Sequence, residues 1–599
     1  MVTHTRQPQG RATPPEGPLE SSAPGFVTDS FLSIGLLLAL SLALQSVIFA
    51  PNAVWPAAYV CLVPWVVVIG ACSNPHRVYY TSYLLGFAFF LVNVRWIAPI
   101  TVEGYIALSA YLAVYFPLVA CPIRHAVRRR RIPMTLALPV IWVGSEFLRG
   151  IVISGFPWFF LAHSHYRVLS LIQVSDLFGA YGVSFVIALI NGAIAEAIFA
   201  TGRRKHAGRG SLRPRRLAWP HLLTTVVLVV AAFVYGQIQM RRDTGAPGPR
   251  IAVIQGDYPI RTSDAFTHPV DRQRFYFRLM REAAAEQPDI YLLPETPWTM
   301  FLNESFLQES NSADPWWRWS RECFRLLQNF STEHNAYVIT GAMSRELTPF
   351  HRLSESWSYN SAFVFRPDGS VPFRYDKVHT VYFGETVPFR FGRFRFLYIW
   401  FNSLSPFGGD VEYSINRGSE FKVFDIAVPP EGGRTYRFGI PICYEDVIPY
   451  VSRRFVIGPD GQKRVDFLLN ISNDGWFLHS NELPQHLASC VFRAVENRVG
   501  IARAVNTGIS GFIDANGRIH HLVTNVLGQS HGPGITGYQV APVQIDSRTS
   551  LYSRIGDVFA LTCCVLWGLA YLDYLIVRIR VNRARAARNR EGDDDACEA

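Results

Sequence analysis

The segment FGIPICYEDVIP, Phe438–Pro449, places a cysteine at the end of a short apolar run. That cysteine, Cys443, is followed at once by Tyr444 and Glu445. The apolar run predicts a buried strand, and in layered α/β domains reactive side chains collect where such strands end. A lone cysteine is nevertheless more often a packing residue than a nucleophile. The segment alone leaves both interpretations open, so the surrounding sequence has to decide between them.

Two other predicted strands end in side chains that complement a thiol. DIYLLPETPW (289–298) carries Glu295 near its end, and a hairpin predicted over 359–377 closes at Lys377. A glutamate in an apolar pocket has a raised pKa and suits proton transfer from a thiol, whereas a lysine ammonium stabilises an oxyanion. Together with a cysteine they form an acyl-transfer set that needs no metal. The alternatives are a helix cap for Glu295 and an exposed ion pair with Asp376 for Lys377.

These segments belong to a stretch of alternating predicted strands and helices at about 245–555. Its strands are rich in branched side chains and are separated by helices, which is typical of a layered α/β domain. His379, His479 and His486 lie in the same stretch, but their spacing is not that of a metal site. We therefore expect neither a metal nor another cofactor.

Much of the remaining chain consists of apolar runs long enough to cross a membrane, which takes about 18 residues or more. Seven such runs precede residue 240 and an eighth follows the α/β stretch. They cover 31–50, 55–72, 79–98, 103–123, 134–151, 180–200, 220–239 and 557–577. Helices buried in a soluble protein do not explain this many runs. The expected fold class is a multi-pass α-helical membrane domain over 30–240 joined to an α/β domain, with a last membrane helix after it.

The segments rich in Lys and Arg predict how the chain crosses the membrane. They lie at 124–133, 203–216 and 578–590, each after an even number of predicted crossings. Because basic loops resist translocation, we expect both termini in the cytoplasm and residues 245–555 outside it. The tail at 1–29 is expected to be disordered, and the tail at 578–599 is basic and then acidic. The formal net charge of +11 is thus mainly a topology signal, and nucleic-acid binding is not expected.

The exported stretch contains three cysteines, Cys323, Cys443 and Cys490. An odd number in an exported domain leaves at least one thiol free. A disulfide between Cys323 and Cys490 remains open, and such a pairing would leave Cys443 as the free thiol.

Four motifs add a family resemblance to these patterns. LLPETPW, RYDKVHTVYFGETVPFR, GIPICYEDV and LLNISNDGWF, in that order, resemble the nitrilase superfamily of carbon–nitrogen hydrolases with its Glu-Lys-Cys triad. KVHTVYFGETVPF and CYED are more similar to the apolipoprotein N-acyltransferases of bacterial envelopes, as are WVGSEFLRG (142–150) and GFPWFF (155–160). The resemblance covers nearly all of the chain except the two polar tails. It implies an αββα sandwich for the exported domain.

Carried over to this sequence, the resemblance implies catalytic roles for three residues. Glu295 would be the proton acceptor, Lys377 would stabilise the oxyanion and Cys443 would be the nucleophile. Supporting positions are implied at Glu385, Tyr444 and Glu445. The first of these, in FGETVPF, would orient or tune the lysine.

The sequence departs from the family where a loop covers the site. The family places a tryptophan after the first strand, but QGDYPIRTSDAFTH contains none. We expect Phe266 or Tyr258 to take its place, and Trp298 to form a wall of the substrate pocket. The stretch FRFGRFRFLYIWF (389–401) alternates Arg with Phe and fits either a membrane-interface segment or an ordinary amphipathic strand.

The implied reaction moves an acyl chain from a phospholipid to Cys443 and then to the α-amino group of a lipoprotein's N-terminal diacylglyceryl-cysteine. The implied location is a bacterial inner membrane, with the catalytic domain periplasmic and the enzyme a monomer. One alternative is a membrane-tethered amidase or nitrilase acting on a small amide, although so many helices exceed the needs of a tether. Another is a transporter or receptor with an exported binding domain. Intramembrane Glu146 and Arg149 lie one helical turn apart, but a helix-stabilising pair explains them more simply than a transport path.

Overall fold

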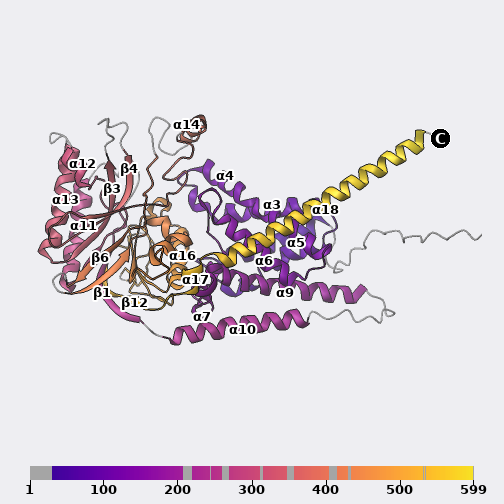
Figure 1. Cartoon of the computed structure of the whole chain (residues 1–599), viewed down its shortest axis with the longest axis horizontal. Helices are drawn as coiled ribbons and strands as arrows, with labels where there is room; N and C mark the ends of the chain where they lie inside the picture. The colour runs from indigo at the N-terminus through magenta and orange to yellow at the C-terminus, as the bar shows by residue number, and fades with distance from the viewer. Residues whose placement is uncertain are drawn as a thin grey trace, which may run out of the picture.

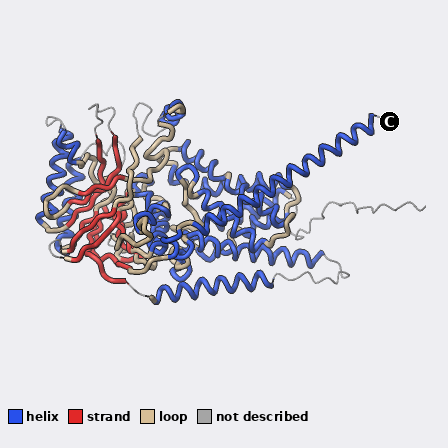
Figure 2. The backbone as a smooth tube through the Cα atoms, in the orientation of Figure 1, coloured by secondary structure: helices blue, strands red, loops and turns tan. Residues whose placement is uncertain are grey.

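The computed structural model describes residues 30–206, 219–242, 245–258, 269–309, 315–346, 357–390, 392–403, 414–429, 433–525, 527–530, 532 and 534–597. The predicted tail at 1–29 and Phe266 lie outside these residues. Strands, with the helices that cover them, occupy one end of the molecule, and the other end consists of helices (Figure 1, Figure 2). The expected division into a helical part and an α/β part is confirmed.

The helical part contains the predicted apolar runs. Its helices are α1 (Phe31–Val47), α2 (Val63–Ala71), α3 (Pro75–Asn93), α4 (Val102–Ala113), α5 (Tyr115–Arg128), α6 (Met134–Arg149), α7 (Leu169–Ile172), α8 (Ser175–Phe178), α9 (Ala180–His206), α10 (Trp219–Arg241), α17 (Leu551–Ile555) and α18 (Val558–Cys597). Among the described residues, four helical stretches are long and apolar enough to cross a membrane, namely 102–128, 180–201, 219–241 and 558–583. Shorter apolar helices cover 31–47 and 55–71.

Two of the predicted runs are not single regular helices. The run at 55–72 forms a 3-10 turn, Trp55–Tyr59, and then α2, and each of these begins with a proline in its first turn. Proline is favoured there because its missing N–H would have no helical partner anyway. The run at 103–123 is divided between α4 and α5 at Val114. Apolar length was therefore a better guide to the presence of these helices than to their continuity.

The α/β part consists of two six-stranded sheets. The first has the order β12-β1-β2-β3-β4-β5 and contains β1 (Gly245–Gln255), β2 (Ile290–Leu292), β3 (Tyr337–Glu346), β4 (Trp357–Phe365), β5 (Phe373–Asp376) and β12 (Gly537–Asp546). The second has the order β11-β10-β9-β8-β7-β6 and contains β6 (Val423–Val428), β7 (Arg434–Gly439), β8 (Phe467–Ser472), β9 (Gly500–Val505), β10 (Gly511–Ile513) and β11 (Ile519–His520). In each sheet the central strands, β1 to β3 and β7 to β9, run parallel.

Side-chain alternation along the strands separates two cores. In β1, Ile251 and Val253 pack between the sheets, whereas Ala252 and Ile254 pack against helices on the outer face. This follows because successive residues of a strand point to opposite faces. The covering helices are α11 (Pro269–Ala283), α12 (Glu304–Glu309) and α13 (Pro315–Glu333) on the first sheet, and α15 (Pro449–Val456) and α16 (Glu482–Asn497) on the second. These layers form the expected αββα sandwich.

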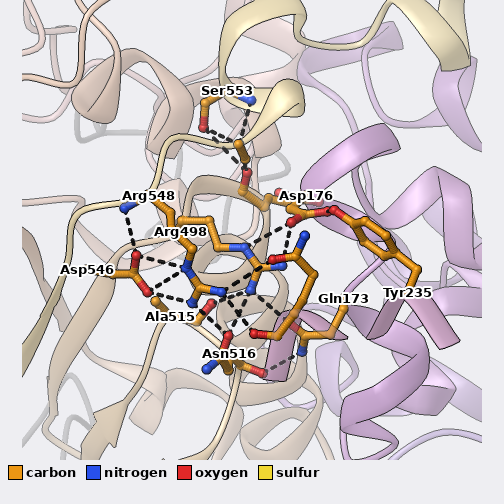
Figure 3. Close-up of polar contacts among 12 residues, drawn as sticks. Gln173, Asp176, Tyr235, Arg498, Ala515, Asn516, Asp546, Arg548 and Ser553 are labelled. Carbon is orange, nitrogen blue, oxygen red and sulfur yellow. Dashed lines mark hydrogen bonds and ion pairs between the residues drawn. The ribbon is translucent and has the colours of Figure 1, made fainter. Parts of the chain in front are cut away.

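A buried polar cluster joins the sandwich to the helical part (Figure 3). Arg498, directly after α16, donates to Asp176 of α8 at 3.0 Å and to Gln173 at 2.7 Å. It also donates to Asn516 at 2.9 Å, and Asn516 accepts a further bond from Arg548 at 2.8 Å. Removing one partner of a buried ion pair costs about 3–5 kcal/mol. The cluster therefore fixes the α/β domain on the helices.

Candidate active site

Cys443 stands at a sharp turn after β7. The strand ends at Gly439, Ile442 forms a bridge with Ile471, and Cys443 then opens a 3-10 turn, Cys443–Asp446. The backbone φ of Cys443 is +52°, in the left-handed region that few residues with side chains adopt. Such conformations persist only where the surroundings hold them, and they cluster at functional sites.

Glu295 and Lys377 lie beside the thiol. They follow β2 and β5 of the first sheet, whereas Cys443 comes from the second sheet. Nζ of Lys377 is 3.8 Å from Oε1 of Glu295, and the charge of that carboxylate acts on the pKa of the Cys443 thiol. Glu295 and Lys377 are buried and Cys443 is partly exposed. The three residues predicted to be catalytic are therefore brought together at the meeting of the two sheets.

Further polar contacts hold the lysine and the glutamate. Oε1 of Glu385 accepts a hydrogen bond from Nζ of Lys377 at 2.8 Å, and its Oε2 accepts from the N–H of Val381 at 2.9 Å. Asn360 of β4 donates to Oε1 of Glu295 at 2.6 Å and to Oε1 of Glu385 at 3.1 Å. Asn360 was missed by sequence reasoning. Its signal was an asparagine inside the strand YNSAFVF, where asparagine is disfavoured.

Burial and charge set the protonation of the three groups. Burial raises the pKa of Glu295 above its usual range, although the neighbouring Lys377 lowers it. Burial also raises the pKa of the Cys443 thiol well above its usual range, and the Glu295 charge raises it further. Burial alone would lower the pKa of Lys377, but Glu385, Cys443 and Glu295 together raise it. In the resting site Cys443 is therefore a neutral thiol that needs a base to ionise. Glu295 has a pKa suited to accept its proton, and Lys377 is an ammonium ion.

Glu445 ties the lysine segment to the cysteine segment. Its carboxylate accepts hydrogen bonds from the backbone N–H groups of Val378 at 2.8 Å, His379 at 2.9 Å and Ile442 at 2.9 Å. The first two N–H groups directly follow the lysine, and the third directly precedes the cysteine. The side chain is fully buried, and burial raises the pKa of its carboxyl group to about 7. Glu445 thus holds the two segments at a fixed separation.

Tyr444 extends from the cysteine turn to the helical part. Its hydroxyl donates to the carbonyl oxygen of Gly155 at 3.1 Å. Its ring lies parallel to the Trp158 ring, with centroids 6.3 Å apart and an interplanar angle of 4°. Both contacts are made by the GFPWFF segment (155–160), so the helical part contributes to the surroundings of the thiol.

Comparison with known proteins finds matches for both parts of the chain. Residues 41–193 match the apolipoprotein N-acyltransferase N-terminal domain, and residues 250–532 match the carbon–nitrogen hydrolase family. The apolipoprotein N-acyltransferase of Geobacter metallireducens is 30% identical over 544 residues, which cover 88% of this chain and 91% of that protein. The chain belongs to the apolipoprotein N-acyltransferase family. It is an acyltransferase with a nitrilase-like α/β domain and apolar helices that could span a membrane.

Other members of the family match a similar share of this chain. The apolipoprotein N-acyltransferase of Bradyrhizobium diazoefficiens is 28% identical over 500 residues, or 81% of this chain and 80% of that protein. Among solved structures, an amidase from Nesterenkonia sp. is 15% identical, with a TM-score of 0.34, over 52% of this chain and 95% of that chain.

The residues expected to line the pocket of this N-acyltransferase occupy different places. Trp298 is buried in the core between the first sheet and α11, and its Nε1 donates to Thr340 at 2.8 Å. Packing uses the Trp298 ring, and its role as a pocket wall stays a prediction. Tyr258 follows β1, with the Arg272 guanidinium 4.5 Å above its ring, and its pocket role stays a prediction. Phe266 lies outside the described residues.

The stretch at 389–401 is not a strand, because its second half forms α14 (Arg395–Ser403). Phe396, Ile399 and Trp400 are 64%, 62% and 57% exposed and follow the spacing of one helix face. In the view of Figure 1, α14 lies at the upper edge of the molecule, where the strands give way to the helical part. An exposed apolar helix face at this junction favours the membrane-interface interpretation over the amphipathic strand.

One buried cluster among the described residues has the geometry of a metal site. Asp474, Glu482 and His486 bring their ligand atoms within 4.8 Å of one another. His486, however, bonds to Asp474 at 2.9 Å and to Asp446 at 2.6 Å, and Arg503 pairs with both aspartates. Burial lowers the pKa of His486, but the two aspartates outweigh it and raise the pKa to about 10. A protonated imidazole offers no lone pair to a metal, so this is a balanced charge cluster.

The remaining cysteines of the α/β domain are free thiols. Cys323, on α13, is buried in the core on the outer face of the first sheet, and Cys490, on α16, is buried in the other core. The disulfide left open by the sequence does not form between them.

Proposed function

We propose that this enzyme transfers an acyl chain from a membrane phospholipid, through a thioester on Cys443, to the α-amino group of an apolipoprotein's N-terminal diacylglyceryl-cysteine. The observation that carries the proposal is the convergence of Glu295, Lys377 and Cys443 in a member of the N-acyltransferase family. All three residues come from one chain, which supports a monomeric enzyme. The reaction uses these side chains without a metal or another cofactor.

In the first step Glu295 accepts the proton of the Cys443 thiol, and the thiolate sulfur attacks the carbonyl carbon of a phospholipid ester. The negative charge that develops on the carbonyl oxygen is stabilised by the Lys377 ammonium and by the backbone N–H after the nucleophile. The ester C–O bond then breaks. Glu295 returns its proton to the leaving oxygen, which departs as a lysophospholipid and leaves the acyl chain on Cys443 as a thioester.

In the second step a neutral α-amino group attacks the thioester carbonyl. Glu295 accepts a proton from the attacking nitrogen, and Lys377 again stabilises the oxyanion. The C–S bond breaks, the Cys443 sulfur recovers the proton from Glu295, and an N-acylated lipoprotein is released. The two half-reactions share one site, which makes the scheme ping-pong.

The apolar helices beside this site would let the two substrates reach the thiol from the plane of the membrane. Both proposed substrates are held in the membrane by acyl chains, so the thiol has to be reached from the lipid side. Two features support this arrangement. Tyr444, next to the thiol, contacts Gly155 of the helical part, and α14 exposes an apolar face at the junction of the two parts (Figure 1).

We further propose that the enzyme lies in a bacterial inner membrane with both termini cytoplasmic and the catalytic domain, 245–555, in the periplasm. The arginine-rich segments support this orientation. α18 runs away from the strands to a C-terminal end that lies far from them (Figure 1). Arg130, in the basic segment at 124–133, donates to Asp573 at 2.7 Å, so this segment lies beside the part of α18 that leads into the basic segment at 578–590. Basic ends stay in the cytoplasm.

Reporter fusions test this orientation. Alkaline phosphatase needs disulfides and so becomes active only outside the cytoplasm. A fusion after residue 300 is expected to be active, and a matched fusion after residue 590 inactive. Active phosphatase only in the second fusion would reverse the proposed topology.

The function itself is tested with purified enzyme in detergent. With a phospholipid labelled in its acyl chains and a diacylglyceryl peptide, we expect labelled N-acyl peptide and one lysophospholipid for each amide formed. Without the acceptor, lysophospholipid release should stop at one molecule per enzyme. Hydrolysis of small amides without release of lysophospholipid would instead establish the amidase alternative and overturn the proposal.

A further inference from the structure

The segment Ser154–Leu161, here called the docking loop, reaches from the end of α6 to the active site. Oγ of Ser154 is 3.2 Å from Nε2 of His379, two residues after the catalytic lysine. The carbonyl oxygen of Gly155 accepts the hydroxyl of Tyr444, the residue after the catalytic cysteine. The docking loop therefore touches the site on both its lysine side and its cysteine side.

The backbone around the start of the docking loop is strained. Ile153, Ser154 and Gly155 have φ values of +53°, +69° and +82°, and Phe159 has +56°. The left-handed region costs a residue with a side chain about 1–2 kcal/mol, and it is least suited to a β-branched residue such as Ile153. Strained backbone persists only where surrounding contacts impose it. The docking loop must therefore be held by groups outside itself.

Arg149, the last residue of α6, makes one set of these contacts. Its guanidinium donates to the carbonyl oxygens of Phe156 at 3.3 Å and Phe159 at 3.4 Å, and also to that of Trp158. The Arg149 side chain is buried. Buried carbonyl groups need donors, and the planar guanidinium can reach several of them at once.

Glu146, one turn earlier on α6, holds the other end of the docking loop. Its Oε1 accepts the N–H of Leu161 at 2.8 Å, and Nε1 of Trp142 at 2.8 Å steadies the same oxygen. The carboxylate is 2% exposed. The hydrogen bonds of Glu146 and Arg149 thus join α6 to the docking loop, so the sequence-based interpretation of a pair that only stabilises its own helix is too narrow.

We propose that Arg149 and Glu146 are positioning residues for acyl transfer: they fix the docking loop, and the docking loop fixes the Tyr444 turn beside the nucleophile. The proposal rests on the proposed function. The backbone N–H of Tyr444 lies next to the position where the oxyanion develops, and a small displacement of a positioned group lowers the rate steeply. The base and the cation that activate the thiol are held by direct hydrogen bonds with Asn360 and Glu385, which lie outside the docking loop. Loss of the anchors should therefore impair acyl transfer while sparing thiol reactivity.

Arg149→Gln tests this separation in the full-length enzyme. The matched control is Arg124→Gln. Arg124 lies near the end of α5, and its guanidinium also donates to carbonyl groups, those of Ile69 and Ser73, at 2.8 Å each. Two rates are measured per folded molecule, well below the melting midpoint: acylation of Cys443 by labelled phospholipid, and alkylation of the same thiol by iodoacetamide. We expect Arg149→Gln to slow acylation by about 100-fold and to leave alkylation unchanged. Arg124→Gln should leave both rates unchanged.

Two milder variants keep the test valid if Arg149→Gln folds poorly. Arg149→Lys keeps the charge but offers a point donor in place of a fork, so it should restore part of the acylation rate. Tyr444→Phe removes only the hydroxyl that reaches Gly155 and should slow acylation by about tenfold, again without a change in alkylation.

The inference is overturned if Arg149→Gln acylates as fast as Arg124→Gln. It is also overturned if acylation and alkylation fall together, which is the signature of a purely structural role. A failure of the proposed function is a different result, because it would show in the unaltered enzyme as the absence of any acyl group on Cys443.

Discussion

Replacing Cys443 by alanine is expected to abolish acyl transfer, with a rate lowered by at least about 10⁴-fold. Alanine has no atom that can form the thioester. Lys377 cannot substitute as a nucleophile, because its neighbours raise its pKa and keep it an ammonium ion. The measurement is transfer of a labelled acyl chain from phospholipid to a diacylglyceryl peptide at equal amounts of folded enzyme.

Cys323→Ala is the matched control for that variant. It also removes a thiol from the α/β domain, but one on α13 that faces the packed core on the outer side of the first sheet. We expect it to lower stability and to keep the transfer rate near that of the unaltered enzyme. Full activity of Cys443→Ala would show that the nucleophile has been misassigned.

Replacing Glu295 by glutamine is expected to slow acylation of Cys443 by about 10²- to 10⁴-fold. The thiol pKa lies well above its usual range, so nearly all of Cys443 is protonated near neutral pH and depends on a base. The ionised form of Glu295 is the active one, and burial raises its pKa. In the unaltered enzyme the rate should therefore fall as the pH drops through a pKa above the ordinary range of glutamate.

The pH profile separates this role from a structural one. In Glu295→Gln the acid limb should disappear, and the rate should instead rise about tenfold per pH unit while the free thiolate fraction grows. Glu286→Gln, at an exposed position after α11, is the control and should keep the original profile. An unchanged acid limb in Glu295→Gln would assign the base to another residue.

The residues proposed to be catalytic could be selected from the sequence because local sequence carries their signal. Glu295, Lys377 and Cys443 each follow an apolar or alternating run inside a recognisable motif, and strand ends gather at one edge of a sheet. Residues that act through distant partners gave no comparable signal. Asn360 meets a glutamate 65 positions away, and Arg498 meets Asp176 across 322 positions. Only the packing of the sheets and helices creates these pairs.

Two stretches show that apolar residues serve packing and binding equally well. Trp298 is the last residue of LLPETPW, the motif that contains the proposed base, yet its ring fills the core against α11. In the stretch at 389–401 the alternation of Arg and Phe fitted either a membrane-interface segment or an amphipathic strand. Phe396, Ile399 and Trp400 share one face of α14. Local pattern shows that such residues are apolar, and tertiary contacts decide what they cover.

The central claim is that Cys443 carries the acyl chain between donor and acceptor. The most direct test incubates the purified enzyme with a phospholipid of known acyl chains, without acceptor, and maps the adduct by mass spectrometry after digestion in acid. We predict one acyl group on the peptide that contains Cys443, removable by hydroxylamine and discharged when a diacylglyceryl peptide is added. An acyl group on a different residue, or the same adduct in Cys443→Ala, would contradict the account.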